Sequence, residues 1–106
     1  MITVTIRRRK GEYTGFSSRG HADYADEGYD IFCAAVSVLT VNTVNAIEQI
    51  AGDRVEDHSE SGLVTCKFPD GLSHDGTVLM ESMVQGLQSI AETSGKSYLR
   101  LRFKEV

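Results

Sequence analysis

The sequence predicts an α+β fold with two layers, in which about five strands form an antiparallel or mixed sheet and two helices pack against it. Short segments at both ends of the chain alternate apolar and polar residues, whereas two longer internal segments carry apolar residues three and four positions apart. Turn-forming residues separate these segments and give the order β-β-α-β-β-α-β. A chain of 106 residues suits a single domain, residues 1–106.

The first two strands are expected to form a hairpin. From Ile2 to Arg8, apolar side chains occupy one face and polar side chains the other, as in a half-buried strand. The segment "KGE", residues 10–12, supplies the turn, because glycine readily adopts the positive backbone dihedral angles of tight hairpins. A second strand is therefore expected from Tyr13 to Ser18.

The first helix is expected from residue 31 to residue 51, with Asp30 as its N-cap and Gly52 as its C-terminal stop. Its β-branched content leaves a strand as a minor alternative. Apolar residues wrap around much of this helix, so we expect it to be largely buried; they are Ile31, Ala34, Ala35, Val38, Leu39, Val41, Ala46 and Ile50.

The second half of the chain repeats this pattern. A second hairpin is expected, with strands from Arg54 to Asp57 and from Leu63 to Phe68. A second helix follows and ends at Gly95, because apolar residues form one stripe: Val78, Leu79, Met83, Leu87, Ile90 and Ala91. The final "SYLRLRFKEV" alternates strictly, which predicts a strand with one apolar face and one basic face.

Composition limits the possible function classes. The chain opens without the long apolar run of a signal peptide or membrane helix, so we expect a cytoplasmic protein that does not bind membranes. In that reducing compartment Cys33 and Cys66 should both be free thiols.

A net charge of −4 argues against a general nucleic-acid binder, and we expect no direct nucleic-acid binding, although a local basic patch remains compatible with this charge.

The segment "RGHADYADEGYDIFCAAVSVLT" concentrates ionisable residues before and inside the first helix. With Asp30 as the N-cap, Cys33 would lie in the first turn, where unpaired backbone N–H groups favour a thiolate and could receive an oxyanion. The loop residue His21 follows the flexible Gly20 and could approach the helix start as an acid or base. Ser37, four residues after Cys33, shares its helical face.

Each of these residues also has a structural interpretation. Cysteine is often buried, a loop histidine is often only solvated, and Ser37 and Asp30 could simply pack and cap. The loop acids Asp23, Asp26 and Glu27 oppose thiolate formation, because like charges repel. We interpret them instead as attracting a positively charged substrate.

The motif "GHA", followed by an acidic loop and "DIFCAAVSVL", resembles the signature of the ribosomal-processing cysteine protease family Prp. The resemblance covers the whole chain in length and element order. It implies a small cytosolic homodimer that needs no cofactor and removes the short N-terminal extension of large-subunit ribosomal protein twenty-seven. In that family the cut follows aromatic residues and precedes a small residue and a basic tail.

The resemblance also assigns roles to residues. It implies that Cys33 is the nucleophile and His21 the catalytic histidine, with Gly20, Asp30 and Ser37 in the accompanying motif positions. Cys33 would attack the peptide carbonyl and His21 would protonate the leaving amine. The loop aromatics Tyr24 and Tyr29 are candidates for contact with the aromatic residues before the cut.

Two alternatives remain open from the sequence. The first is a non-catalytic, ribosome-associated binding protein that uses the basic residues of the first and last strands, "RRRK" at residues 7–10 and those of residues 100–104. The second is a metal site at His21, Asp23 and Cys33, which is weaker because their spacing matches no compact zinc motif. We therefore expect no metal.

Overall fold

The computed structural model describes residues 1–20, 27–60, 62–94 and 98–106. Its elements are β1 (Ile2–Arg9), β2 (Glu12–Arg19), α1 (Glu27–Ala46), the π-helical turn η1 (Ile47–Ala51), β3 (Glu56–Glu60), β4 (Leu63–Lys67), α2 (His74–Ser94) and β5 (Leu99–Glu105). The expected element order is confirmed, and the first helix ends as expected, because η1 continues α1 to Gly52, whose φ of 75° is left-handed.

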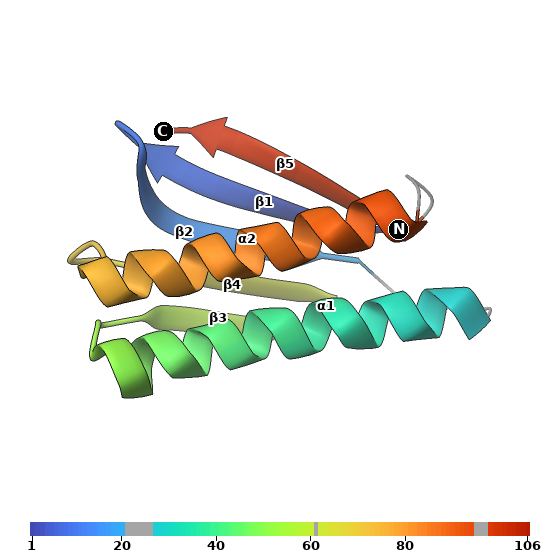
Figure 1. Ribbon diagram of the computed structural model, residues 1–106, viewed down its shortest axis with the longest axis horizontal. Coiled ribbons are helices and arrows are strands. Elements are labelled where there is room, and N and C mark those ends of the chain that lie inside the picture. The colour runs from blue at the N-terminus through green and yellow to red at the C-terminus, as the bar shows by residue number, and fades with distance from the viewer. Residues whose placement is uncertain (21–26, 61, 95–97) are drawn as a thin grey trace.

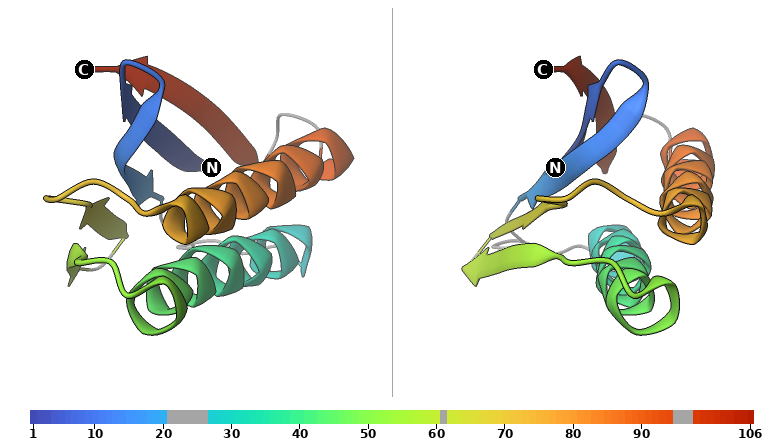
Figure 2. Two further views of the ribbon diagram at one scale, coloured as in Figure 1. Left: turned by 60° about the vertical axis from the view of Figure 1, so that its left-hand side comes forward. Right: turned by 90° about the vertical axis from the view of Figure 1, so that its left-hand side faces the viewer.

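The strands form one mixed sheet in the order β3-β4-β2-β1-β5. The pairs β1–β2, β2–β4 and β3–β4 are antiparallel, whereas β5 runs parallel to β1. Both helices lie side by side on the same face of this sheet (Figures 1 and 2), as expected for two layers. The opposite face of the sheet has no layer over it in the described part of the chain.

The core fills the space between the sheet and the helices. The largest side chains in it are almost fully buried: Val4 and Ile6 from β1, Phe16 from β2, Cys66 from β4, Leu99 from β5, Ile47 from η1, and Met80, Met83 and Leu87 from α2. Burial of each such side chain stabilises the fold by about 1.5–3 kcal/mol. Both helices therefore pack against the sheet through one apolar core.

The expectation that the first helix is largely buried is wrong. Val36, Val44 and Ile47 face the core, whereas Val38 is 68% exposed and Ile50 is 74% exposed. The helix lies in a layer of only two helices, so its outer face has no neighbour from this chain. Residues 31–51 have a mean hydropathy of 1.5 over an 18-residue window, which by length and composition alone would suffice for a membrane span. The apolar residues of this helix are divided between the core and the outer face.

Two boundaries also differ from the expected ones. Asp30 is not an N-cap, because α1 begins three residues earlier, at Glu27. Acidic residues are favoured throughout the first helical turn, so the acidic pattern does not fix which residue is the boundary. The strand expected at Arg54–Asp57 instead runs from Glu56 to Glu60, since pairing with β4 through the backbone accommodates its polar side chains at an exposed sheet edge.

The second helix and the last strand match the expected pattern more closely. Met83 and Leu87 lie in the core as expected, whereas Val78 is 51% exposed. Helix α2 ends at Ser94, and Gly95 lies outside the described residues. In β5 the basic residues point away from the helices, and Leu99 points into the core.

Gly20 lies where the end of β2 meets two other segments. Its N–H donates a hydrogen bond to the carbonyl oxygen of Gly62 at 2.9 Å. A Cβ atom at this position would lie 2.8 Å from the carbonyl oxygen of Met1 and 2.9 Å from the Cα of Ile2. Glycine is therefore required by close packing against the start of β1. The loop that the sequence interpretation expects Gly20 to bend, residues 21–26, lies outside the described residues.

We expect Gly20→Ala to lower the free energy of unfolding by about 1–3 kcal/mol, because backbone atoms on β1 must shift to admit a methyl group. The measurement is a urea unfolding curve followed by circular dichroism. Ser18→Ala, two residues earlier on the same strand, is the matched control and should change stability by less than about 0.5 kcal/mol. An unchanged midpoint for Gly20→Ala would contradict this account of the glycine.

Candidate active site

Cys33 lies in the second turn of α1, half-buried against the core. Its side chain lines an open cleft of about 220 Å³. The cleft is formed where several strands begin or end, and it is lined by Ile2, Ser18, Gly20, Val36, Ser37, Glu60, Gly62, Leu63 and Val64 in addition to Cys33. The sulfur is thus in a position that a ligand can reach from outside.

The helical turn that carries Cys33 is anchored by an aromatic pair. Phe32 stacks on Tyr98, with ring centroids 5.0 Å apart and an angle of 24° between the planes. Such pairs contribute about 0.5–1.5 kcal/mol beyond the burial of their surface. Because Phe32 is the residue before Cys33, this contact helps to fix the rotation of α1 relative to the sheet.

The position of Cys33 in the helix corrects one part of the sequence interpretation. With α1 beginning at Glu27, Cys33 is the seventh helical residue and lies beyond the first turn. Its backbone N–H therefore belongs to the regular helical hydrogen-bond ladder and is not free to receive an oxyanion. The unpaired N–H groups of this helix end instead belong to the first turn of α1, which begins at Glu27.

Ser37 is exposed and lines the same cleft as Cys33, so it is not a buried packing residue. Sequence reasoning missed two further polar residues in the cleft, Ser18 and Glu60. Glu60 Oε1 lies 2.8 Å from His58 Nε2. The sequence carried no spacing signal for these residues, because the sheet register, Ser18 opposite Val64 and Glu60 opposite Leu63, brings them to the cleft.

Several predicted site residues cannot be placed from the described part of the chain. His21, Asp23, Tyr24 and Asp26 lie outside the described residues. Glu27, Tyr29 and Asp30 lie in the first turn of α1 by their backbone, and their side chains are likewise outside the description. Gly20, the residue directly before His21, lines the cleft. In the sequence, residues 21–26 stand between Gly20, which lines the cleft, and the helix that carries Cys33.

The second thiol, Cys66, lies in the core with an exposed fraction of 1%. Burial is the main cause that raises the pKa of this thiol to about 12, and the carboxylates of Asp57 and Glu48 add to it. At neutral pH Cys66 therefore stays protonated. Only a thiolate is a strong nucleophile, so the structure separates a reachable Cys33 from an inert Cys66.

The other hollows on the described surface lack a candidate nucleophile. Three larger hollows, two of about 700 and 640 Å³ along α2 and β5 and one of about 410 Å³ on α1, are lined by no cysteine or histidine. Among the described residues, no group of three or more His, Cys, Asp or Glu side chains is arranged to hold a metal ion. A nucleophile matters more for an active site than volume, so the cleft at Cys33 is the candidate.

The fold and the cysteine in the cleft are those of a small α+β protein with a candidate thiol nucleophile. A sequence profile of the cysteine protease Prp family matches residues 1–99. The chain therefore belongs to the Prp family of cysteine proteases, and it is a cysteine protease.

Curated relatives and solved structures agree with this assignment. The chain is 30% identical to the ribosomal processing cysteine protease Prp of Staphylococcus aureus over 98% of this chain and 100% of that one. It is 29% identical to the Bacillus subtilis protein of the same name over 92% and 90% of the two chains.

Two solved structures superpose on the chain with a TM-score of 0.90. SMU.848 from Streptococcus mutans is 28% identical and covers 100% and 99% of the two chains. The S. aureus Prp in complex with a substrate peptide is 29% identical and covers 98% and 100%. A further S. aureus structure, with a covalently linked product peptide, has a TM-score of 0.88 at 30% identity over 98% and 100% of the chains.

We expect iodoacetamide to alkylate Cys33 in the folded protein at pH 7.5 and to leave Cys66 unmodified. Even at pH 9 a pKa of about 12 leaves about one Cys66 thiol in a thousand as thiolate. The measurement is peptide mass mapping after timed alkylation, and the same reaction in 8 M urea, where both thiols should react, is the control. Modification of Cys66 ahead of Cys33 in the folded protein would contradict the assignment.

Proposed function

We propose that this cysteine protease removes the short N-terminal extension of large-subunit ribosomal protein twenty-seven, with Cys33 as nucleophile and His21 as acid and base. The observation that carries the proposal is the half-buried Cys33 sulfur in an open cleft of about 220 Å³. The curated relatives are named ribosomal processing proteases, which supports a ribosomal protein as the substrate.

The reaction is acyl transfer in two steps. The Cys33 thiolate attacks the peptide carbonyl, the carbon–nitrogen bond breaks, and His21 gives its proton to the leaving amine. Water, deprotonated by His21, then attacks the thioester, and the carboxylate product leaves while Cys33 regains the thiolate. The position of Gly20 at the cleft supports this role for His21, because His21 directly follows Gly20, which lines the cleft.

Oxyanion stabilisation requires donors other than the N–H of Cys33. The first turn of α1 retains unpaired backbone N–H groups, and the Ser37 hydroxyl lies in the cleft on the Cys33 face. We assign Ser37 a positioning role toward the substrate or the thiol. Its exposure supports this role, since a hydroxyl at this position is free of core packing.

Charge in and beside the cleft suits a basic peptide. Glu60 lines the cleft, Asp23 and Asp26 follow the cleft residue Gly20 in the sequence, and Glu27 is the first residue of α1. Carboxylates attract a cationic tail over a Debye length of about 8 Å at physiological ionic strength. Tyr24 and Tyr29 remain the candidates for contact with aromatic residues before the cut.

The outer face of α1 supports a homodimer. Ile31, Val38, Val41 and Ile50 on α1 and η1 are all more than half exposed. Several exposed apolar residues on one helical segment mark an interaction surface more often than a solvated one. A second copy of the chain presents the same apolar surface, so the two copies can pack symmetrically.

We expect Cys33→Ala to reduce kcat/KM by at least about a thousandfold, because no other described thiol reaches the cleft. The assay mixes enzyme with the extended ribosomal protein and measures the shortened product by mass spectrometry. His21→Ala should cause a loss of similar size if it moves the proton. Cys66→Ala is the matched control and should retain cleavage. Full activity of folded Cys33→Ala would overturn the proposed mechanism.

We expect Val38→Asp to convert the dimer to monomers, with the dissociation constant raised by at least about a hundredfold, because a carboxylate would be buried without a partner. Sedimentation velocity measures the change. Val78→Asp places the same substitution at a comparably exposed valine on α2 and should leave the dimer intact. A monomeric wild-type chain, or a Val38→Asp dimer of unchanged affinity, would show that this surface does not join two copies.

A further inference from the structure

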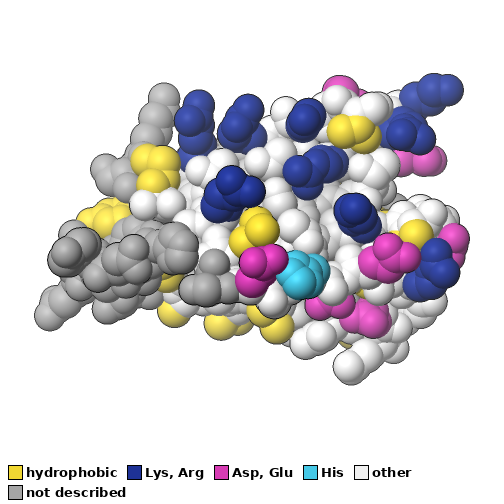
Figure 3. Space-filling model, turned by 180° about the vertical axis from the view of Figure 1, so that it is seen from behind, with side chains coloured by type: hydrophobic (Ala, Val, Ile, Leu, Met, Phe, Trp, Pro, Cys, Tyr) yellow, Lys and Arg dark blue, Asp and Glu magenta, His cyan; other side chains and the backbone are white. Residues whose placement is uncertain are grey.

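The face of the sheet that no helix covers carries a concentration of positive charge (Figure 3). Strand alternation and register place seven basic side chains on it, which we call the basic sheet face: Arg7 and Arg9 on β1, Arg19 on β2, Lys67 on β4, and Arg100, Arg102 and Lys104 on β5. The whole chain has a net charge of −4, so this face differs in sign from the molecule as a whole.

The register arranges these cations in rows across the sheet. Arg100 lies opposite Thr3, which lies opposite Arg19. Neighbouring strands are about 4.8 Å apart and alternate residues along a strand about 6.7 Å apart. The cations of the basic sheet face therefore lie within one or two Debye lengths of each other, and their potentials add.

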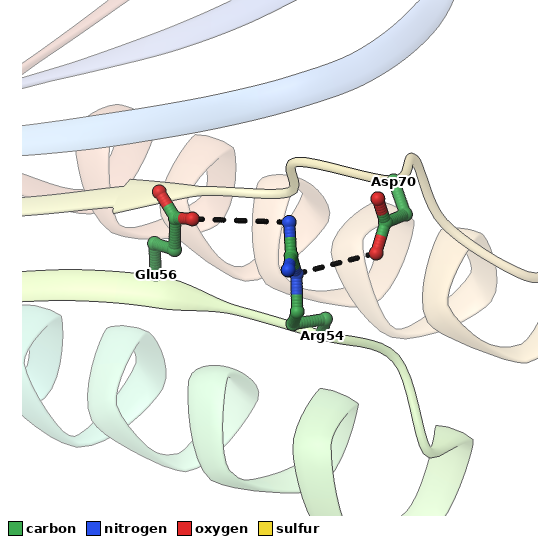
Figure 4. A network of polar contacts seen from close by, with 3 residues as sticks. All are labelled: Arg54, Glu56 and Asp70. Atoms are coloured by element: carbon green, nitrogen blue, oxygen red, sulfur yellow. Dashed lines mark ion pairs between the residues drawn. The ribbon is translucent and has the colours of Figure 1, made fainter.

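Few acidic side chains among the described residues neutralise the basic sheet face. The ion pairs in the described part of the chain join Arg8 to Glu105, Arg54 to Glu56 and Asp70, and His58 to Glu60, and none of them involves the basic sheet face. Three acids lie on the same side by register. Glu12 is opposite Arg9 at the β1–β2 hairpin end. Glu56, opposite Lys67, and Glu60 lie at the β3 edge, where they pair with Arg54 and His58 (Figure 4 shows the Arg54 pairs).

The side chains that lie between the cations mainly carry hydroxyl groups. Thr3, Thr5, Ser17 and Thr65 point to this side by the same alternation, and they are partly buried. Arginine, lysine and hydroxyl side chains are the groups that most often contact the phosphates of nucleic acids. A protein partner would instead call for aromatic or apolar anchors at the centre of the patch.

The absence of aromatic side chains at the described outward positions favours a double-stranded nucleic acid over a single-stranded one. The outward positions of the described strands β1, β2, β4 and β5 hold no aromatic side chain on which an unpaired base could stack. A surface of cations and hydroxyls suits recognition of a backbone, as in proteins that bind double-stranded RNA largely by its shape and phosphates.

Against the expectation of no nucleic-acid binding that the net charge of −4 gives, we propose that the basic sheet face binds the phosphate backbone of double-stranded RNA and so docks the protease beside its substrate. The choice of RNA rests on the proposed function, since a ribosomal-protein substrate is made for assembly with RNA. The face adjoins the cleft, because Leu63, which lines the cleft, pairs with Arg19 on β2 and Glu60 on β3.

The test measures binding of the full chain to a fluorescein-labelled 16-base-pair RNA duplex by fluorescence anisotropy between 50 and 200 mM NaCl. We expect binding that weakens with salt, because each phosphate contact contributes roughly −0.7 to −0.9 to the slope of log K against log salt. Arg100→Gln with Arg102→Gln should lower affinity at least tenfold and reduce the slope by about 2. Arg7→Gln with Lys67→Gln is an independent pair on the same face and should act similarly.

The control variant is Arg54→Gln, which removes one positive charge from a side chain already paired with Glu56 and Asp70. It should leave RNA affinity within about twofold. All variants should cleave an isolated peptide substrate with unchanged kcat/KM, so a failure of RNA docking and a failure of the protease assignment give different results.

Three results would overturn the inference. These are no RNA binding by the wild type at 50 mM NaCl, binding that survives in both double variants, and equal or tighter binding to poly-glutamate, which would assign the face to an acidic protein. Equal affinity for a DNA duplex of the same sequence would reject RNA as the specific occupant.

Discussion

The site depends on one close approach of the backbone, between Gly20 and the start of β1. Gly20 donates to Gly62, and Ile2 donates to the carbonyl oxygen of Tyr98 at 2.9 Å, so the ends of four strands are tied together at this end of the sheet. Tyr98 then stacks on Phe32, next to the cleft thiol on α1. A contact path therefore runs from the hairpin ends to the helix turn that carries the nucleophile, and the cleft exists because no side chain at residue 20 forces these segments apart.

The arrangement of layers determines what each surface can do. Placing both helices on one face of the sheet buries the apolar half of every inner strand and leaves the other half in water. The covered side provides the core and the cleft at its end, whereas the bare side collects cations. Because the two helices also lack a third layer, the outer face of α1 stays apolar and exposed, with Val38 at 68%. One two-layer packing thus yields a cleft, a charged face and an apolar face in separate places.

The sequence predicted the order of the elements because alternation and helical spacing are local signals, which survive in any tertiary context. It failed where the answer depended on neighbours. The burial of α1 could not be judged from its apolar residues, since these face both the core and the outside. Asp30 was assigned as a cap because an acid suits the whole first turn of a helix. Ser18 and Glu60 reach the cleft through strand register, which no spacing in the sequence encodes. Cys33 is identifiable from the motif around it, whereas its expected place in the first helical turn is wrong.

The two proposals, for the cleft and for the basic sheet face, are physically coupled. A basic peptide tail is attracted by Glu60 in the cleft but repelled by Arg19, which flanks the neighbouring Leu63 on the outward side. Phosphates bound to the basic sheet face would neutralise that repulsion without occupying the cleft. The affinity for a basic substrate should then rise when RNA is bound, and by thermodynamic linkage the substrate must raise the affinity for RNA by the same factor. Glu60 and Arg19 lie on the same side of one sheet end, on either side of Leu63, so neutralisation of Arg19 by bound RNA favours a substrate presented together with RNA over the free peptide.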